Sequence, residues 1–408
     1  MSRPFVKSDP PTSLEPTIGH LRLVPVASPP DPEVLKAVVT ASQRALAPTF
    51  AVGVVLCLAG LAFDLSPWHR LVAVPVTPLV LLGYLVVGFA LARRWFQQAD
   101  VSTVELNQKL TDTELALIEA ADAYSRFFPE QFLRHFERKS VAQVRLGDQV
   151  ARGMTVMFAD IRNFTAMSEN LTPEENFRFL NDYYGRIGPV IREQYGFIDK
   201  YIGDAIMALF DGPVDEAIAA AVAIQLATAD YNLNLKDQRF GPITIGVGLH
   251  SGPLMLGVIG EIDRMESTVI ADAVNLASRI ESLTKYYDCR ILLTRSTFEA
   301  QSDPLPYMTR PVDLVRVKGR RESVELLEIL DERFDPRAFL KRDLAAHLAE
   351  ALIVYRRGEF QEARILFQRL AYLDPQDVLY GIYRRRTEEM VRLGKPEGWT
   401  GINEFAFK

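Results

Sequence analysis

The chain has 408 residues, a length typical of two or three domains, and its formal net charge of −6 provides no basic surface of the kind that binds nucleic acid. Its two cysteines, Cys57 and Cys289, are too few and too far apart for a disulfide framework or a zinc site. We therefore expect several modules in a reducing compartment and no nucleic-acid partner.

Residues 1–45 are rich in proline. Eight of the 24 prolines lie within the first 33 residues, where there is little hydrophobic periodicity. Such a segment cannot bury enough apolar surface to become ordered. We expect it to be a disordered cytoplasmic tail.

Two long uncharged stretches follow within residues 46–92. Nineteen uncharged positions separate Arg44 from Asp64, and twenty-two separate Arg70 from Arg93. Each is close to the roughly 20 residues that cross a bilayer, so we predict a hairpin of two transmembrane helices, with a pair of buried core helices as the alternative. The basic residues at the outer ends place both chain termini in the cytoplasm. This predicts a multi-pass protein of a bacterial inner membrane with a cytoplasmic catalytic domain.

Residues 93–149 are predicted to form a signalling helix followed by a transducer segment. Apolar and small residues recur there at alternating spacings of three and four, which is the heptad pattern of a coiled coil. We expect a parallel dimeric helix that carries a signal, with a simple spacer helix as the alternative. The heptad positions are Phe96, Ala99, Thr103, Leu106, Leu110, Thr113, Leu117, Ala120 and Tyr124.

Residues 150–333 are predicted to form an α+β domain of the ferredoxin-like or palm type. The run MTVMFAD is typical of a buried strand, and Thr172 with Glu175 predicts a capping box at the start of a helix. The segment GFIDKYIGDAIMALF predicts a β-hairpin with Asp204 at its tip. A helix from Val214, a strand pair, a helix and a strand follow, which predicts a sheet with helices on one face.

Residues 334–408 are predicted to form a small helical tail. The segment ALIVYRRGEFQEARILFQRLAYLDPQD has the spacing of one tetratricopeptide-like helical hairpin. A single repeat cannot bury its own faces, so we expect it to pack on the catalytic domain or on a second copy, and it could bind a protein partner. An ordinary helical extension is the alternative.

Two aspartates are placed where metal-assisted chemistry is possible, although many carboxylates at strand ends are merely solvated. If the strand end at Asp160 adjoins the hairpin tip at Asp204, the two carboxylates can hold two divalent cations about 4 Å apart. Hard cations prefer carboxylates and phosphates, so we expect Mg²⁺, or Mn²⁺, two per active site. The turn from Ile161 through Phe164 to Thr165 leads towards a helix whose backbone N–H groups can bind phosphate oxygens. We therefore place Ile161 with the metal ligands, and Phe164 and Thr165 with the substrate.

A second pair of candidate residues lies on a later predicted helix. Asn275 and Arg279 are four residues apart, so both side chains lie on one helix face. A guanidinium presents a rigid fork of donors to phosphate oxygens, and a preorganised cation stabilises charge that develops during transfer. A surface asparagine and a solvated arginine are the alternative.

Four motifs, in order along the chain, resemble the catalytic domain of class III nucleotidyl cyclases, the family of adenylate and guanylate cyclases. They are FADIRNFT, DKYIGDAIMALF, TVIADAVNLASR and VKGRRESVEL, and the resemblance covers about residues 150–330. It implies that Asp160 and Asp204 bind the two metal ions. It also implies a homodimer with its active sites at the subunit interface.

The resemblance implies further roles one residue at a time. Lys200 matches the lysine that reads the adenine ring. Thr268 stands where many members carry an aspartate as the second base-reading residue, and a threonine at this position resembles the bacterial subgroup often linked to bicarbonate stimulation. Asn275 matches the residue that orients the ribose, Arg279 the residue that stabilises the transition state, and Lys318 the residue that binds the triphosphate.

The sequence therefore predicts a membrane-anchored adenylate cyclase that converts ATP to 3′,5′-cyclic AMP and pyrophosphate. The lysine donor at Lys200 favours adenine, because a guanine reader is expected to carry a carboxylate there. A guanylate cyclase is the alternative enzyme. A membrane receptor or scaffold that binds nucleotide without catalysis is the alternative outside the enzymes.

Overall fold

The computed structural model describes residues 76–125, 127–138, 140–234, 241–302, 307–317 and 322–405, with a few positions between 51 and 62. The chain has two compact units, residues 1–117 and 118–408. The predicted disordered tail and most of the first predicted membrane helix lie outside the described residues.

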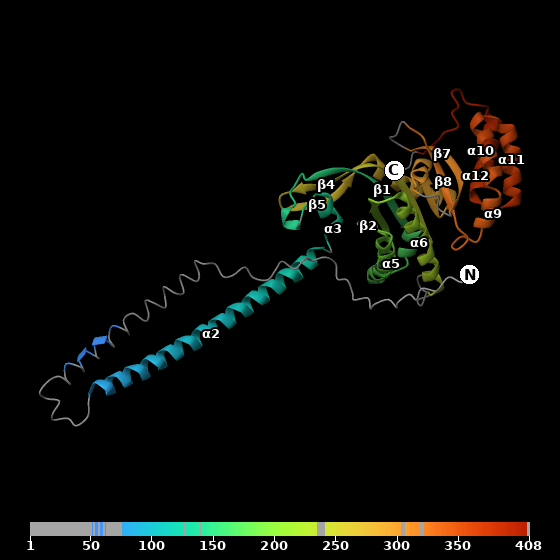
Figure 1. Cartoon of the computed structure of the whole chain (residues 1–408). Helices are drawn as coiled ribbons and strands as arrows, with labels where there is room; N and C mark the ends of the chain where they lie inside the picture. The colour runs from blue at the N-terminus through green and yellow to red at the C-terminus, as the bar shows by residue number, and fades with distance from the viewer. Residues whose placement is uncertain are drawn as a thin grey trace, which may run out of the picture. The chain divides into compact units, whose positions relative to one another are not determined.

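A long helix, α2, runs from Val76 to Ser125 (Figure 1). It contains the whole predicted heptad pattern, which agrees with the absence of proline from that stretch. Several apolar heptad side chains on α2 are exposed: Phe96 at 62%, Leu106 at 60%, Leu110 at 53% and Leu117 at 72%. The described residues of a single chain therefore leave these apolar heptad side chains exposed.

The prediction of a membrane-spanning hairpin is contradicted as far as the structure describes the chain. Within the part of the chain that the structure describes, no helix has an apolar stretch long enough to cross a bilayer. Residues 76–92 of the second uncharged stretch lie in α2, and the helix continues through Arg93 and Arg94 into a polar segment. The predicted location in an inner membrane is contradicted with it.

The described strands of residues 118–408 form one mixed sheet with the order β2-β3-β1-β4-β6-β8-β7-β9. Strand β5 pairs with residues 255–261 of β4. Its centre is the antiparallel pair of β1 and β4, while β4 with β6 and β7 with β9 are parallel pairs. The strands are β1 (Gln149–Ile161), β2 (Phe197–Ile202), β3 (Ala205–Phe210), β4 (Ile245–Glu261), β5 (Arg264–Ile270), β6 (Ile291–Thr294), β7 (Met308–Val317), β8 (Val324–Leu330) and β9 (Asn403–Phe405).

The α+β class is as predicted, but β4 differs from the prediction. The sequence predicts a strand pair over residues 243–260, with one strand ending at Gly252 and the next beginning at Pro253. The structure has a single strand there, and β1 pairs with it without a break from Gln149 opposite Gly257 to Ile161 opposite Ile245. A neighbouring strand of matching length thus keeps the Gly-Pro step extended.

Helices cover both faces of the sheet, which corrects the prediction of helices on one face. Alternate residues of β6 show this, since Ile291 and Leu293 pack in the core with α5 and α6, whereas Leu292 packs in the core with α7 and the C-terminal helices. The helices of this unit are α3 (Glu130–His135), α4 (Phe164–Ser168), α5 (Pro173–Glu193), α6 (Val214–Leu233), α7 (Asp272–Tyr287), α8 (Arg295–Glu299), α9 (Ala338–Asp343), α10 (Ala345–Arg357), α11 (Phe360–Leu373) and α12 (Val378–Leu393).

Local sequence signals set the elements that carry the site. The capping box at Thr172 and Glu175 is confirmed, because each side chain bonds to the other residue's backbone N–H. The predicted hairpin is also confirmed: β2 and β3 are joined by Gly203, with a φ of 62°, and Asp204. A positive φ is readily adopted by glycine, so Gly203 allows the tight turn that presents Asp204.

The C-terminal helices belong to the same compact unit as the sheet. Residues of α10, α11 and α12 share one core with α7, β7 and β8, and Figure 1 shows these helices beside β7 and β8. A buried ionic network joins the two parts, with Arg310 bonded to Glu328 and Asp377, and with Lys341 bonded to Glu328 and Asp335. The tetratricopeptide-like assignment itself stays a prediction.

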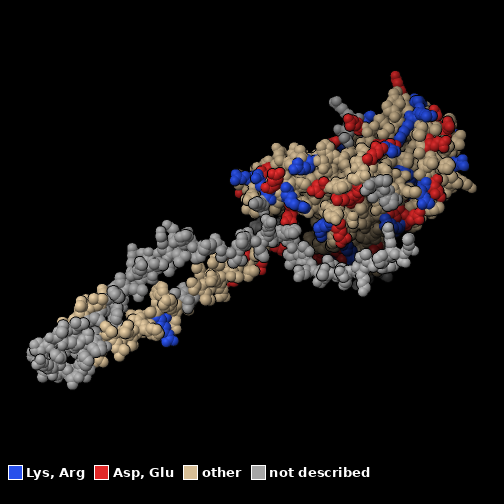
Figure 2. Space-filling model, in the orientation of Figure 1, with Lys and Arg blue, Asp and Glu red and all other residues tan. Residues whose placement is uncertain are grey.

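The surface of residues 118–408 has no single-sign field on the face shown in Figure 2, where basic and acidic side chains are interspersed. This distribution fits the small negative net charge of the chain. It gives no electrostatic reason for a polyanionic partner on that face.

Candidate active site

The structure brings Asp160 and Asp204 together. Asp160 lies at the end of β1 and Asp204 at the tip of the β2-β3 hairpin, and β1 and β3 are neighbouring antiparallel strands. The backbone N–H of Ile161 donates to Oδ2 of Asp204 over 3.3 Å, which ties the hairpin tip to the end of β1. Asp160 Oδ1 is buried without a hydrogen-bond partner among the described residues.

The electrostatics of this pair fit a cation site. Burial, a hydrogen bond with Asp160 and the charge of Asp160 raise the pKa of Asp204 to about 7. Two carboxylates that share one buried position oppose each other's ionisation, and a divalent cation removes that opposition. A bound metal ion would therefore give Asp160 Oδ1 a partner, and it would favour the ionised form of Asp204.

The turn after Asp160 is held in a defined shape. Asn163 has a φ of 58°, a left-handed conformation that asparagine tolerates better than most residues, and the short helix α4 begins at Phe164. The Phe164 ring stacks on Phe179 of α5 with the ring centroids 6.1 Å apart. Phe164 thus anchors the turn, and the backbone of Thr165 lies in the first turn of α4.

Lys200 and Thr268 meet, although 68 residues separate them. Lys200 Nζ donates to Thr268 Oγ1 over 2.9 Å and lies 3.2 Å from Glu266 Oε1. Thr268 and Glu266 are two positions apart on β5, so their side chains share one face of the strand. A third group, the buried carboxylate of Asp199, lies 3.5 Å from the same Nζ.

Asn275 and Arg279 both lie on α7, as predicted. Asn275 is exposed and its side-chain amide makes a 3.5 Å contact with the carbonyl of Ala271, while Arg279 is half-buried. Helix α7 is pressed close to the sheet at Gly248, where a Cβ would lie 2.3 Å from the Glu281 nitrogen. Lys318, the predicted triphosphate ligand, lies outside the described residues.

The structure adds ionisable groups that sequence reasoning missed. Burial, followed by the charge of Asp160, raises the pKa of Glu281 to about 8. Burial also raises the pKa of Asp199 to about 6 despite the neighbouring Lys200. Asp199 begins one of the quoted motifs and Glu281 lies two residues after another, but an acid on an amphipathic helix or an edge strand is expected to be solvated when only the sequence is considered.

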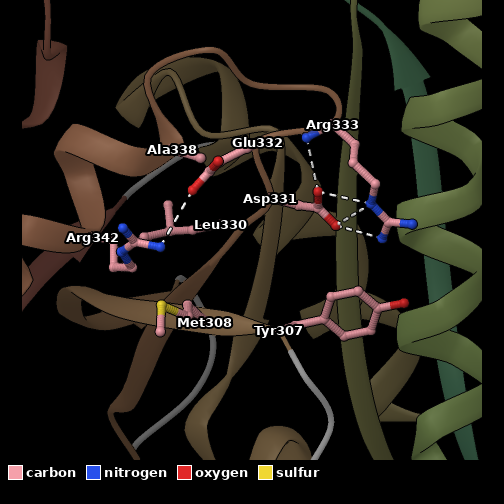
Figure 3. A pocket seen from close by; sticks show the side chains of 8 residues that line it. All are labelled: Tyr307, Met308, Leu330, Asp331, Glu332, Arg333, Ala338 and Arg342. Atoms are coloured by element: carbon pink, nitrogen blue, oxygen red, sulfur yellow. Dashed lines mark hydrogen bonds and ion pairs between the residues drawn. The ribbon is translucent and has the colours of Figure 1, made fainter.

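A separate hollow of about 470 Å³ lies at β7, β8 and α9 (Figure 3). Its charged side chains are already paired, Arg333 with Asp331 and Arg342 with Glu332. None of the predicted site residues lines it. We therefore locate the candidate active site at Asp160 and Asp204 rather than in this hollow.

Comparison with known proteins finds one family over the part of the chain that contains Asp160 and Asp204. Residues 148–328 match the family described as the adenylate and guanylate cyclase catalytic domain. An adenylate cyclase of Anabaena cylindrica is 42% identical over 234 residues, which cover 56% of this chain and 47% of that protein. The terminal-differentiation specific adenylate cyclase of Dictyostelium discoideum is 35% identical over 272 residues, which cover 66% of this chain and 13% of that protein.

Among solved structures, the crystal structure of the guanylyl cyclase Cya2 is 32% identical, with a TM-score of 0.40; the match covers 45% of this chain and 94% of that one. The catalytic domain of this chain is that of a nucleotidyl cyclase. Residues 148–328 match the catalytic domain of the class III adenylate and guanylate cyclase family, so the family resemblance predicted from the sequence is confirmed for this domain. The chain spans about half or less of the length of the two curated relatives named above.

Proposed function

We propose that this protein is an adenylate cyclase, which converts ATP to 3′,5′-cyclic AMP and pyrophosphate. In this reaction the ribose 3′-hydroxyl attacks the α-phosphorus and pyrophosphate leaves. The observation that carries the proposal is the convergence of Asp160 with Asp204 inside a cyclase domain. The two relatives named adenylate cyclases support ATP as the substrate.

Asp160 and Asp204, with the adjoining backbone of Ile161, are the residues that would hold two Mg²⁺ or Mn²⁺ ions. Such ions, when bound, activate an attacking oxygen and stabilise a leaving one in displacement at phosphorus. Asp204 must lose its proton before it can act as a ligand, since its pKa is raised to about 7. The hydrogen bond from Ile161 holds its carboxylate beside the end of β1.

Lys200 and Thr268 form the base-reading pair of this proposal. The Lys200 ammonium donates to a bare ring nitrogen of adenine, and the Thr268 hydroxyl can accept from the exocyclic amino group. Guanine presents a carbonyl and a ring N–H at the same edge, so the ammonium discriminates against its N–H. The contact of 2.9 Å between Nζ and Oγ1 supports a joint role for the two side chains.

Asn275 orients the ribose and Arg279 stabilises the charge that develops on the phosphoryl oxygens, with Lys318 and the turn at Phe164 and Thr165 binding the triphosphate. We propose that these groups act across the interface of a homodimer. Exposed apolar side chains gather on and near β5, close to the base-reading pair, as expected of an interface. They are Ile202 at 51%, Ile259 at 45%, Ile262 at 86%, Met265 at 49% and Ile270 at 61%.

Helix α2 supplies a second proposed dimer contact. Its exposed heptad residues are suited to a parallel coiled coil with the same helix of a second copy. Stimulation by bicarbonate and a protein partner at the C-terminal helices stay predictions. Turnover measured with and without bicarbonate checks the first, and affinity capture on residues 334–408 against the full chain checks the second.

The direct test of substrate choice is competition between ATP and GTP with Mg²⁺ or Mn²⁺ present. We expect cyclic AMP as the main product, with pyrophosphate released in equal amount. Predominant cyclic GMP would favour the alternative guanylate cyclase. Nucleotide binding without pyrophosphate release, at any concentration that permits dimers, would favour the non-catalytic receptor.

A further inference from the structure

We infer that Arg162 and Asp288 form a strut, defined here as this ion pair and its flanking hydrogen bonds, which fixes the metal-site loop to the C-terminal end of α7. Arg162 Nη1 lies 2.6 Å from Asp288 Oδ1. Arg162 Nη2 donates to the carbonyl of Thr284 over 2.9 Å and also to that of Cys289. One guanidinium thus binds the charged residue that ends α7 and two carbonyls beside it.

The strut holds the metal-site loop and the end of α7 in a fixed position, which an ion pair between two surface side chains alone would not do. The Arg162 side chain is only 13% exposed, and its backbone N–H donates to the carbonyl of Thr244 over 2.8 Å. Asp288 has a φ of 54°, the left-handed conformation that commonly ends a helix. The Arg162 guanidinium therefore stabilises the C-terminal end of α7, while the backbone of Arg162 is bonded to Thr244. Together these interactions hold the loop and the helix end in one relative position.

The strut joins two parts of the catalytic machinery. Arg162 directly follows Asp160 and Ile161, and α7 carries Asn275 and Arg279. Arg279 lies nine residues before Asp288, which is about 14 Å along a rigid helix. A displacement at Asp288 is therefore transmitted to Arg279.

This inference rests on the proposed function, and it takes each pocket of the proposed homodimer to combine the metal ligands of one copy with Arg279 of the other. Within one chain the strut then ties the metal loop of one pocket to the helix that serves the second pocket. Arg162 and Asp288 act as positioning residues that couple the two pockets of the dimer. We expect them to affect the position of the catalytic groups and not the binding of ATP.

The C-terminal helices reach the same point. Arg337 Nη2 lies 3.6 Å from Asp288 Oδ2, and Arg337 Nη1 donates to the carbonyl of Gln376 over 2.7 Å. Asp288 is thus shared between an arginine of the metal loop and an arginine at the start of α9. The distance from Arg162 to Asp288 is 2.6 Å and that from Arg337 to Asp288 is 3.6 Å, so we assign the stronger interaction with Asp288 to Arg162.

The test uses full-length dimers that have one working pocket. One copy carries Arg279→Ala and supplies metal ligands, and the other carries Asp204→Ala and supplies Arg279; two affinity tags allow purification of the mixed dimer. Asp288→Asn is then placed in either copy. Asparagine tolerates the left-handed conformation, so this change removes the charge without forcing the backbone to move.

We expect a fall in kcat of about tenfold or more for either placement, with KM for ATP changed less than about threefold, because the misplaced groups act in the transition state. Arg162→Lys, which keeps the charge but loses the fork of donors, should show the same fall. Arg333→Gln breaks an arginine–aspartate pair at the hollow in Figure 3 and is the matched control, with no expected change.

An unchanged kcat for the Asp288→Asn dimers, or a fall from one placement only, would overturn the strut. So would a fall that merely follows loss of folded protein, as read from the melting temperature. An inactive mixed dimer without any strut change has a different meaning. It would overturn the proposed division of the pocket between two copies, and the coupling with it.

Discussion

At the residue scale, Asp204 makes the site sensitive to pH. Its pKa is raised to about 7 by burial and by Asp160, so a proton competes with the metal ion below that pH. We expect the apparent affinity for Mn²⁺ to fall about tenfold for each pH unit below 7 and to level off above about pH 8. Calorimetric titration with Mn²⁺ between pH 6 and 8.5 measures this, and a pH-independent affinity would contradict the assignment.

The same raised pKa has a consequence for stability. The folded state holds the Asp204 proton more tightly than the unfolded state does, so this group's contribution is favourable below about pH 4 and is lost as the pH rises through 7. Asp204→Asn should therefore raise the melting temperature of metal-free protein at pH 8 while abolishing turnover. An equal or lower melting temperature would argue against strain between the two carboxylates.

Lys200 is the residue that selects adenine over guanine in the proposed pocket. Lys200→Glu replaces the ammonium with an acceptor, which suits the ring N–H of guanine and repels the bare ring nitrogen of adenine. We expect kcat/KM for ATP to fall about 100-fold or more, and the ratio of GTP to ATP use to rise. If the ratio stays unchanged, Lys200 does not read the base.

At the element scale, the position of α7 depends on the glycines of β4. A Cβ at Gly248 would lie 2.3 Å from the Glu281 nitrogen and 2.8 Å from the Ala277 carbonyl oxygen, so Gly248→Ala must push α7 off the sheet. We expect turnover to fall at least about tenfold, because α7 carries Arg279. Gly153→Ala on β1 is the matched control, since among the described residues no atom beyond its chain neighbours lies within 4 Å of the added Cβ.

Elements with strong local signals could be predicted from the sequence. The capping box at Thr172 and the hairpin at Gly203 depend on residues a few positions apart, and both are present. The single strand β4 could not be predicted, because what keeps Gly252 and Pro253 extended is their pairing with β1. The covering of both sheet faces likewise depends on contacts between segments far apart in the chain.

The candidate site shows the same division. The convergence of Asp160 with Asp204 follows from two adjacent strand ends, and the motifs point to both residues. Glu281 and the contact of Arg162 with Asp288 depend on how α7 crosses the sheet. The hydrophobic periodicity of the sequence does not predict how α7 crosses the sheet.

At the scale of the whole molecule, the C-terminal helices are part of the catalytic unit. Lys341 is 1% exposed and its Nζ lies 2.8 Å from both Glu328 Oε1 and Asp335 Oδ2. Lys341→Met removes the cation that bonds Asp335 and leaves the buried Glu328 with Arg310 alone, which should cost about 3–5 kcal/mol of unfolding free energy. Chemical denaturation measures it, with the exposed Lys285→Met as control; equal stability of the two variants would show that the network does not hold the helices on the sheet.

The most direct measurement of the account is the conversion of ATP by purified full-length protein, compared with Asp204→Asn at a temperature where both are folded and at equal dimer content. We predict equal amounts of cyclic AMP and pyrophosphate from the unaltered protein with Mn²⁺, and none above background from the variant. Folded, dimeric, unaltered protein that forms no cyclic AMP, or a variant that forms as much, would contradict it.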